Sequence, residues 1–153
     1  MKNIIKLIIS LVICQLAGVI GSFFNIKSIP TWYASLIKPS FNPPNWVFAP
    51  VWTTLFLLMG ISLYLVWIKG FTKQALIFFS IQLFLNILWS ALFFGLKSPF
   101  LAFIEIIVLW AFILLTIIYF YRISKPAFYL LLPYILWVSF AAILNFYILV
   151  LNT

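Results

Sequence analysis

Five long apolar runs dominate the sequence and leave few folds open to the chain. They cover approximately residues 4–24, 47–68, 74–96, 100–121 and 127–151 of the 153. Each run is about 21–25 residues long, and about 20 residues of α-helix cross the hydrocarbon core of a bilayer. Membrane β-barrel strands would instead be alternating segments of about 10 residues. The sequence therefore predicts an all-α integral membrane bundle of five transmembrane helices, with residues 1–153 forming a single domain.

The composition excludes several kinds of chemistry. Hydrophobic residues make up 67% of the chain and charged residues only 7%, and there is no histidine. Histidine-dependent catalytic triads, histidine-containing zinc sites and histidine-ligated haem are therefore excluded. Cys14 is the only cysteine and Glu105 the only acid, so conventional acid–base catalysis has almost no parts. We expect no metal site, no required cofactor and no classical enzyme.

The net charge of +8 comes from single Lys and Arg residues between the apolar runs. A scattered distribution does not form a phosphate-binding stripe, so we expect no nucleic-acid partner. With five spans, six basic residues lie on the side of the N-terminus and three on the other. This asymmetry predicts a cytoplasmic N-terminus and a C-terminus on the opposite side. The short chain has no organelle presequence, which favours a bacterial membrane. The two groups are Lys2, Lys6, Lys69, Lys73, Arg122 and Lys125 against Lys27, Lys38 and Lys97.

The first connection, about residues 25–46, is long and has an unusual composition. Flexible linkers contain few aromatic residues, and prolines restrict the backbone. We therefore predict that this loop folds back as a lid over one end of the bundle. The alternative is a loop lying among the lipid headgroups, where Trp and Tyr are common. Its prolines and aromatic residues are Pro30, Pro39, Pro43, Pro44, Trp32, Tyr33 and Phe41.

Polar residues recur every four positions in two of the spans, which places each set on one helical face. Amides that face lipid are costly when unpaired, so both faces should point into the bundle. One interpretation is that these residues join helices through hydrogen bonds and packing. The other is a cavity with aromatic walls and a few polar groups. The spacing alone does not choose between them. The sets are Gln82, Asn86 and Ser90, and Pro133, Trp137, Ala141 and Asn145.

Glu105 lies about one and a half turns into the fourth span. A carboxyl group inside the membrane is costly and is a candidate for function. Because Glu105 is close to the start of the span, pairing near the interface, for instance with Lys97, is the favoured interpretation.

Three sequence blocks resemble the TspO/MBR family of tryptophan-rich sensory or translocator proteins, whose animal members were called peripheral benzodiazepine receptors. They are WYASLIKPSFNPP at residues 32–44 with its continuation to Trp52, QLFLNILWSALFFG at 82–95, and PYILWVSFAAILN at 133–145. The blocks keep their order and extend over nearly the whole chain. The resemblance implies a bundle whose first loop closes a central pocket, with Trp32, Pro39, Phe41, Pro43 and Pro44 in the lid.

The resemblance also implies a function: a receptor or translocator that binds porphyrins, namely protoporphyrin IX or haem, for sensing, scavenging or transport. An enzyme-like alternative is light- and oxygen-dependent degradation of protoporphyrin, in which Trp52 and Trp137 take part. A small transporter or channel of another class is the second alternative. The family is often dimeric, although Ile77 and Ile81 replace a glycine pair used for dimer contacts. The implied ligand-binding positions are Tyr33, Trp52, Asn86, Trp89, Trp137, Ala141 and Leu144.

Overall fold

The computed structural model describes residues 2–153, and all the regular secondary structure in this part of the chain is helical. Five helices are long and apolar enough to cross a membrane, which confirms the predicted fold class. Two of them end in short π-helical segments, η1 and η2. The elements are α1 (Lys2–Ser28), η1 (Ile29–Tyr33), α2 (Asn45–Lys69), α3 (Lys73–Ser90), η2 (Ala91–Gly95), α4 (Pro99–Ile123) and α5 (Lys125–Leu151).

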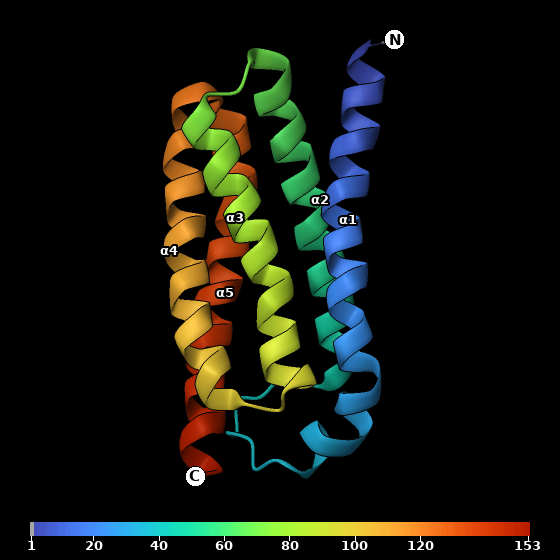
Figure 1. The fold of residues 1–153 in the computed structure, drawn as a ribbon, viewed down its shortest axis with the longest axis vertical. Helices are drawn as coiled ribbons and strands as arrows, with labels where there is room; N and C mark the ends of the chain where they lie inside the picture. Colours follow the sequence, from blue (N-terminus) through green and yellow to red (C-terminus); the bar gives the residue numbers. More distant parts are fainter. Residues whose placement is uncertain (1) are drawn as a thin grey trace.

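The short connections contain the residues that helix ends require. Gly70 ends α2 with φ of 102°, a conformation that side chains with a Cβ rarely adopt. The Oγ1 atom of Thr72 accepts a hydrogen bond from the amide of Ala75 at 3.2 Å and so caps α3. Ser98 caps α4 in the same way. These turns place consecutive helices antiparallel, so the two termini lie at opposite ends of the bundle (Figure 1).

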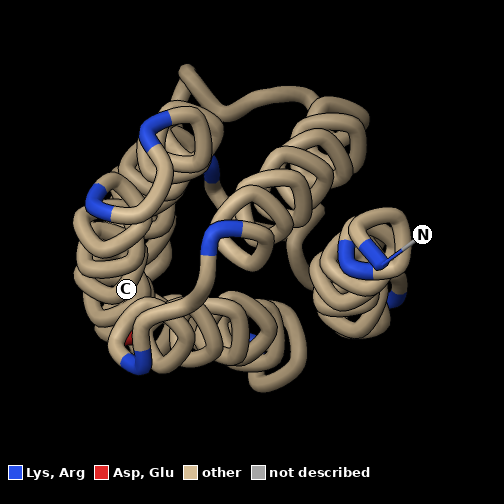
Figure 2. Tube along the Cα trace, turned by 90° about the horizontal axis from the view of Figure 1, so that it is seen from above, with Lys and Arg blue, Asp and Glu red and all other residues tan. Residues whose placement is uncertain are grey.

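The helices form a closed ring. Each helix packs on the next in the order α1, α2, α5, α4 and α3, and α3 packs on α1. Figure 2 shows this arrangement along the bundle axis. The ring separates two kinds of apolar surface. Tightly packed apolar residues such as Met59, Ile113 and Phe120 are buried inside it. Large side chains such as Phe84 and Leu136, which are 63% and 68% exposed, point outward, as expected where the solvent is lipid.

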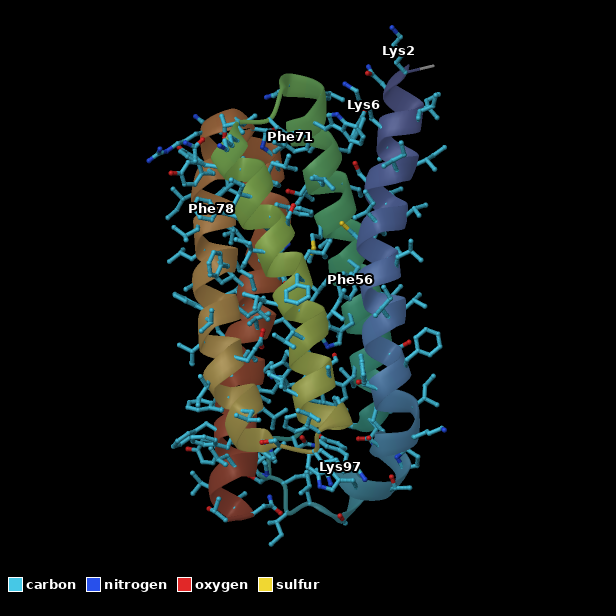
Figure 3. The ribbon with its side chains drawn as sticks, in the orientation of Figure 1. Lys2, Lys6, Phe56, Phe71, Phe78 and Lys97 are labelled. Atoms are coloured by element: carbon cyan, nitrogen blue, oxygen red, sulfur yellow. The ribbon has the colours of Figure 1, made fainter. Side chains whose placement is uncertain are left out.

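Basic residues gather at the two ends of the bundle. Lys2 and Lys6 lie at the end with the N-terminus, and Lys97 lies at the other end (Figure 3). The α2–α3 and α4–α5 connections, with Lys69, Lys73, Arg122 and Lys125, share the end of the N-terminus (Figure 1). The more basic end is therefore the one predicted to face the cytoplasm, and that assignment stays a prediction.

The first helix departs from the expected boundaries. The run at residues 4–24 was predicted to end before a loop of residues 25–46, but α1 continues to Ser28 and η1 to Tyr33. Pro30 does not end the helix: it lies inside the continuous helical span Lys2–Tyr33, at the second residue of η1. The hydroxyl of Ser28 donates to the carbonyl of Phe94 at 2.7 Å and so ties this extension to η2. Within the predicted loop, only residues 36–44 lack helical structure.

Candidate functional site

One cavity of about 410 Å³ lies inside the ring, and all five helices contribute to its walls. Pockets for drug-sized ligands are typically about 300–1,000 Å³. The sequence-predicted positions come together here, although they are spread over 112 positions of the chain from residue 33 to residue 144. All of them line the cavity: Tyr33, Trp52, Asn86, Trp89, Trp137, Ala141 and Leu144.

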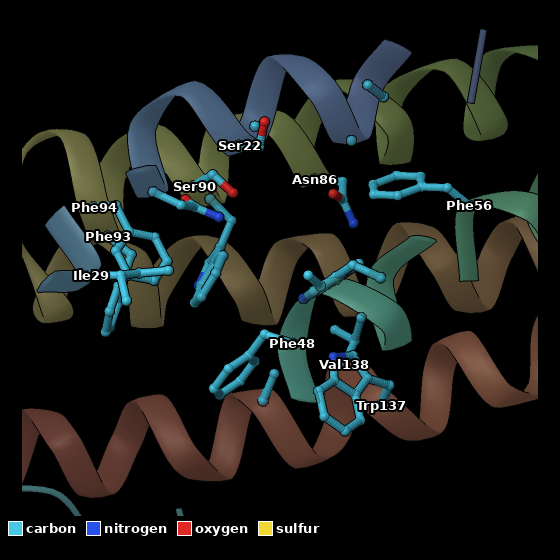
Figure 4. Close-up of a pocket in the computed structure, with 18 of the residues that line it drawn as sticks. Ser22, Ile29, Phe48, Phe56, Asn86, Ser90, Phe93, Phe94, Trp137 and Val138 are labelled. Atoms are coloured by element: carbon cyan, nitrogen blue, oxygen red, sulfur yellow. The ribbon is translucent and has the colours of Figure 1, made fainter. Parts of the chain in front are cut away.

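Three indoles enter the cavity from three different helices. Trp52 comes from α2, Trp89 from α3 and Trp137 from α5. In Figure 4, Trp137 and Phe48 lie across the cavity from Asn86 and Ser90. Apolar side chains close the ends: the Phe56 ring lies at one end, and Ile29 with the rings of Phe93 and Phe94 lies at the other. The walls therefore present flat, polarisable surfaces on several sides.

A buried hydrogen-bond chain joins α3 to α5 beside the cavity. The Nδ2 atom of Asn86 donates to the hydroxyl of Tyr134 at 2.8 Å, and this hydroxyl donates to Oε1 of Gln82 at 2.9 Å. Tyr134 is 1% exposed and Gln82 also 1%. The Nε2 atom of Gln82 lies 3.6 Å from the sulfur of Met59 on α2. The polar face of α3 thus points into the bundle, as its spacing predicted.

A second chain connects three helices near the other end of the cavity. The indole N–H of Trp89 donates to Oδ1 of Asn145 at 3.1 Å. The Nδ2 atom of Asn145 donates in turn to the carbonyl of Pro99, at 2.9 Å. That carbonyl belongs to the first turn of α4. Asn145 therefore orients the Trp89 ring and joins α3, α5 and α4.

The first loop packs against the end of the bundle opposite to the N-terminus (Figure 1). Phe41 packs edge-on against Tyr147, with ring centroids 5.2 Å apart. The backbone of Ile37 exchanges two hydrogen bonds with the Asn152 side chain, at 2.9 and 2.8 Å. The hydroxyl of Tyr33 donates to Oδ1 of Asn42 at 2.9 Å. These contacts tie residues 36–44 to α5 and to η1.

The lid residues do not share one position. Tyr33, on η1 rather than in a loop, lines the cavity. Trp32 is on the same turn, where its ring packs against Phe93 with centroids 5.4 Å apart. Pro39, Phe41, Pro43 and Pro44 are in the irregular segment and are not among the cavity-lining residues. The helical extension of α1 thus forms the inner layer at this end, and the irregular segment lies outside it.

The expected pairing of Glu105 with Lys97 is wrong. Glu105 is 7% exposed, and neither carboxyl oxygen has a hydrogen-bond partner within residues 2–153. Lys97 follows η2 in an exposed turn with φ of 54°. Glu105 therefore faces into the packed bundle rather than toward the interface. It is not one of the residues that line the cavity, although the adjacent Ile106 is.

Sequence reasoning missed the contribution of α1 to the site. Gln15, Gly18, Ser22 and Asn25 all line the cavity. Their spacing of three, four and three residues places them on one helical face, so the signal was present in the sequence. Small residues at Cys14, Gly18 and Ser22 also predict close helix packing. Gly18 does pack closely against Phe56. The Oδ1 atom of Asn25 is buried and accepts no hydrogen bond from residues 2–153.

Comparison with known proteins decides the family. A sequence model of the TspO/MBR family matches residues 10–151. The chain belongs to the TspO/MBR family. It is 48% identical to the "Tryptophan-rich protein TspO" of Chlorobaculum tepidum, over 99% of this chain and 98% of that protein. It is 49% identical to the protein of the same name from Archaeoglobus fulgidus, over 98% and 99%. The human "Translocator protein" is 38% identical over 83% of this chain and 78% of its own length.

Membership of the TspO/MBR family places the chain among multi-pass integral membrane proteins and supports a membrane receptor or sensory role. The matched region includes every residue that lines the cavity. The cavity is therefore part of the region that this chain shares with its relatives.

Proposed function

We propose that this TspO/MBR protein is a receptor or translocator that binds porphyrins, protoporphyrin IX or haem, and related flat apolar ligands in the cavity. The observation that supports this proposal is the convergence of Trp52, Trp89 and Trp137 on one space of about 410 Å³. Indole rings stack on flat aromatic partners and contribute about 0.5–1.5 kcal/mol per pair beyond surface burial. Binding would serve sensing, scavenging or transport.

The cavity chemistry favours stacking over coordination. The chain has no histidine, so a porphyrin would bind without the commonest axial ligand of haem iron. Polar edges of a ligand would meet Asn25, whose Oδ1 atom has no donor among residues 2–153, and Asn86. The remaining wall is mostly apolar and aromatic, as in typical sites for flat ligands.

The test is a titration of the purified protein in detergent with protoporphyrin IX in the dark, followed by tryptophan fluorescence. We expect saturable quenching in the wild type and about two- to tenfold weaker binding in Trp137→Phe, from the loss of indole stacking. The matched control is Trp46→Phe, because Trp46 is 75% exposed and does not line the cavity. Equal affinity in both variants, or no saturable quenching in the wild type, would refute the proposal.

A second candidate is light- and oxygen-dependent degradation of bound protoporphyrin. The specific observation in its favour is that Trp52 and Trp137, both oxidisable, line the same cavity from α2 and α5. Illumination of the complex in air should then produce new absorbing products at a rate that falls in Trp52→Phe and Trp137→Phe. If both variants bind but the wild type yields no more product than free porphyrin in detergent, this candidate is excluded.

A transporter or channel of another class receives the least support. Such a function needs a polar or charged pathway across the membrane. No Lys, Arg or Glu is among the cavity-lining residues that the structure describes. Two of the lining amides, Asn86 and Asn145, are already engaged in hydrogen bonds within the wall.

A further inference from the structure

Helix α1 changes its neighbours along its length. Near its N-terminal half it packs tightly on α2: a Cβ atom added to Gly60 would lie 3.0 Å from the Cα atom of Leu11. At Gly18 the ring of Phe56 on α2 is still in close contact, at 2.7 Å from such a Cβ. Further along, a Cβ added to Gly21 would meet Oγ of Ser90 on α3 at 3.3 Å. The contacts of α1 thus pass from α2 to α3.

The same change continues to the end of the helix. The Ser28 hydroxyl bonds to the carbonyl of Phe94 on η2, and Phe24 lies against Gly95 of the same segment. Because the second half of α1 leans toward α3 and η2, it leaves space between itself and the first half of α2. The cavity occupies this space: Ser22, Asn25 and Ile26 of α1 line it together with Asn45 and Ala49 of α2.

Several of these residues line the cavity and are exposed on the outer surface as well. Val19 and Ile26 of α1 are 49% and 65% exposed, and Asn45, Ala49 and Thr53 of α2 are also exposed. A side chain that belongs both to a cavity and to the outer surface marks the mouth of that cavity. From residue 45 to residue 53 the mouth extends about 12 Å along α2, at 1.5 Å per residue.

The depth of the mouth decides what it faces. Its residues lie within the spans Lys2–Tyr33 and Asn45–Lys69, so the mouth opens sideways to the bilayer. At its inner edge the side-chain amide of Gln15 donates to the carbonyl of Thr53 at 3.1 Å and joins the two helices. The end of the cavity nearest the water is closed by Tyr33, Phe93 and Phe94, whose rings pack together with centroids 4.8–6.2 Å apart.

We propose that the cavity receives its ligand from the lipid bilayer, through this side opening between α1 and α2. The ligand class is a flat, largely apolar molecule dissolved in the membrane, and the irregular first loop is not its entrance. This inference rests on the proposed function of the cavity as a ligand site, and it adds the route and the phase from which the ligand comes.

The test measures the rate of binding in lipid nanodiscs, followed by the fluorescence anisotropy of protoporphyrin IX, alongside its equilibrium affinity. Val19→Trp fills the mouth from α1 and Ala49→Trp fills it from α2. Ile20→Trp is the matched control, because Ile20 is 45% exposed on the same helix but does not line the cavity. We expect association to slow at least about tenfold in the two mouth variants, and to be unchanged in the control.

A further variant tests entry from the water at the loop. Asn152→Ala removes both hydrogen bonds to Ile37 and should leave the association rate unchanged. Suppose that the wild type binds saturably. Unchanged association rates in Val19→Trp and Ala49→Trp, or faster association in Asn152→Ala, would then overturn the side opening as the route but leave the ligand site intact. Absence of saturable binding by the wild type would overturn the proposed function itself, together with the route.

Discussion

The Tyr134 hydroxyl is the centre of the buried network, and removing it should weaken the bundle by a predictable amount. In Tyr134→Phe the ring stays, including its edge-on contact with Trp52 at 6.3 Å between centroids. Two hydrogen bonds, to Asn86 and Gln82, disappear. Such bonds between membrane helices contribute about 0.6 kcal/mol each on average and about 1.7 at most. The expected loss is therefore about 1–3 kcal/mol.

The assay is reversible unfolding in mixed detergent micelles, with helicity followed by circular dichroism, for Tyr134→Phe, Gln82→Leu and the double variant. Because both single changes break the same bond, the double variant should lose less stability than the sum of the two. The bond to Asn86 is broken only when the hydroxyl is removed. Tyr134→Phe should therefore lose at least the stability that this one bond contributes. Additive losses, or an unchanged stability in Tyr134→Phe, would refute the assigned network.

Three further changes test other parts of the structure. Gly60→Ala should cost about 1–3 kcal/mol in the same unfolding assay, because the new methyl meets the backbone of Leu11, which cannot move freely; an unchanged stability would contradict this close approach. Asn152→Ala should speed hydrogen exchange of the Ile37 amide, which loses its acceptor, and an unaltered exchange rate would show that the loop is held otherwise. Glu105→Gln should not lower the thermal unfolding temperature in detergent, since neither carboxyl oxygen has a partner among residues 2–153; a clear drop would reveal a partner for the carboxylate.

The sequence determines the five spans because a bilayer tolerates few alternatives to long apolar helices. The ends of the helices are harder to predict where neighbouring residues favour different structures. Pro30 and the aromatic residues beside it predict a loop, but the chain stays helical to Tyr33. The reason is tertiary: Ser28 bonds to η2, and Trp32 packs on Phe93. A single sequence does not show a helix end that is stabilised by residues more than 60 positions away.

The cavity was more predictable in its aromatic walls than in its mouth. Trp52, Trp89 and Trp137 follow from the resemblance, and Trp137 also from helical spacing; all three line the cavity. The lining by Gln15 and Asn25 was missed, because polar residues in a first span also suit packing or the interface. Their role depends on how α1 leans away from α2, which is a property of the assembled bundle rather than of α1 alone.

The two interpretations of the polar stripes prove to be compatible, and their combination has a consequence for selectivity. Asn86 and Asn145 join helices through hydrogen bonds and also line the cavity. Asn145 uses both its oxygen and its nitrogen within the wall, whereas Asn86 uses only its nitrogen and keeps an acceptor for a ligand. Sites gain their strongest discrimination from polar groups that a wrong ligand leaves unpaired. The Oδ1 atoms of Asn25 and Asn86 therefore remain as acceptors, and a flat ligand with a donor at either position should bind more tightly than one of the same size without it.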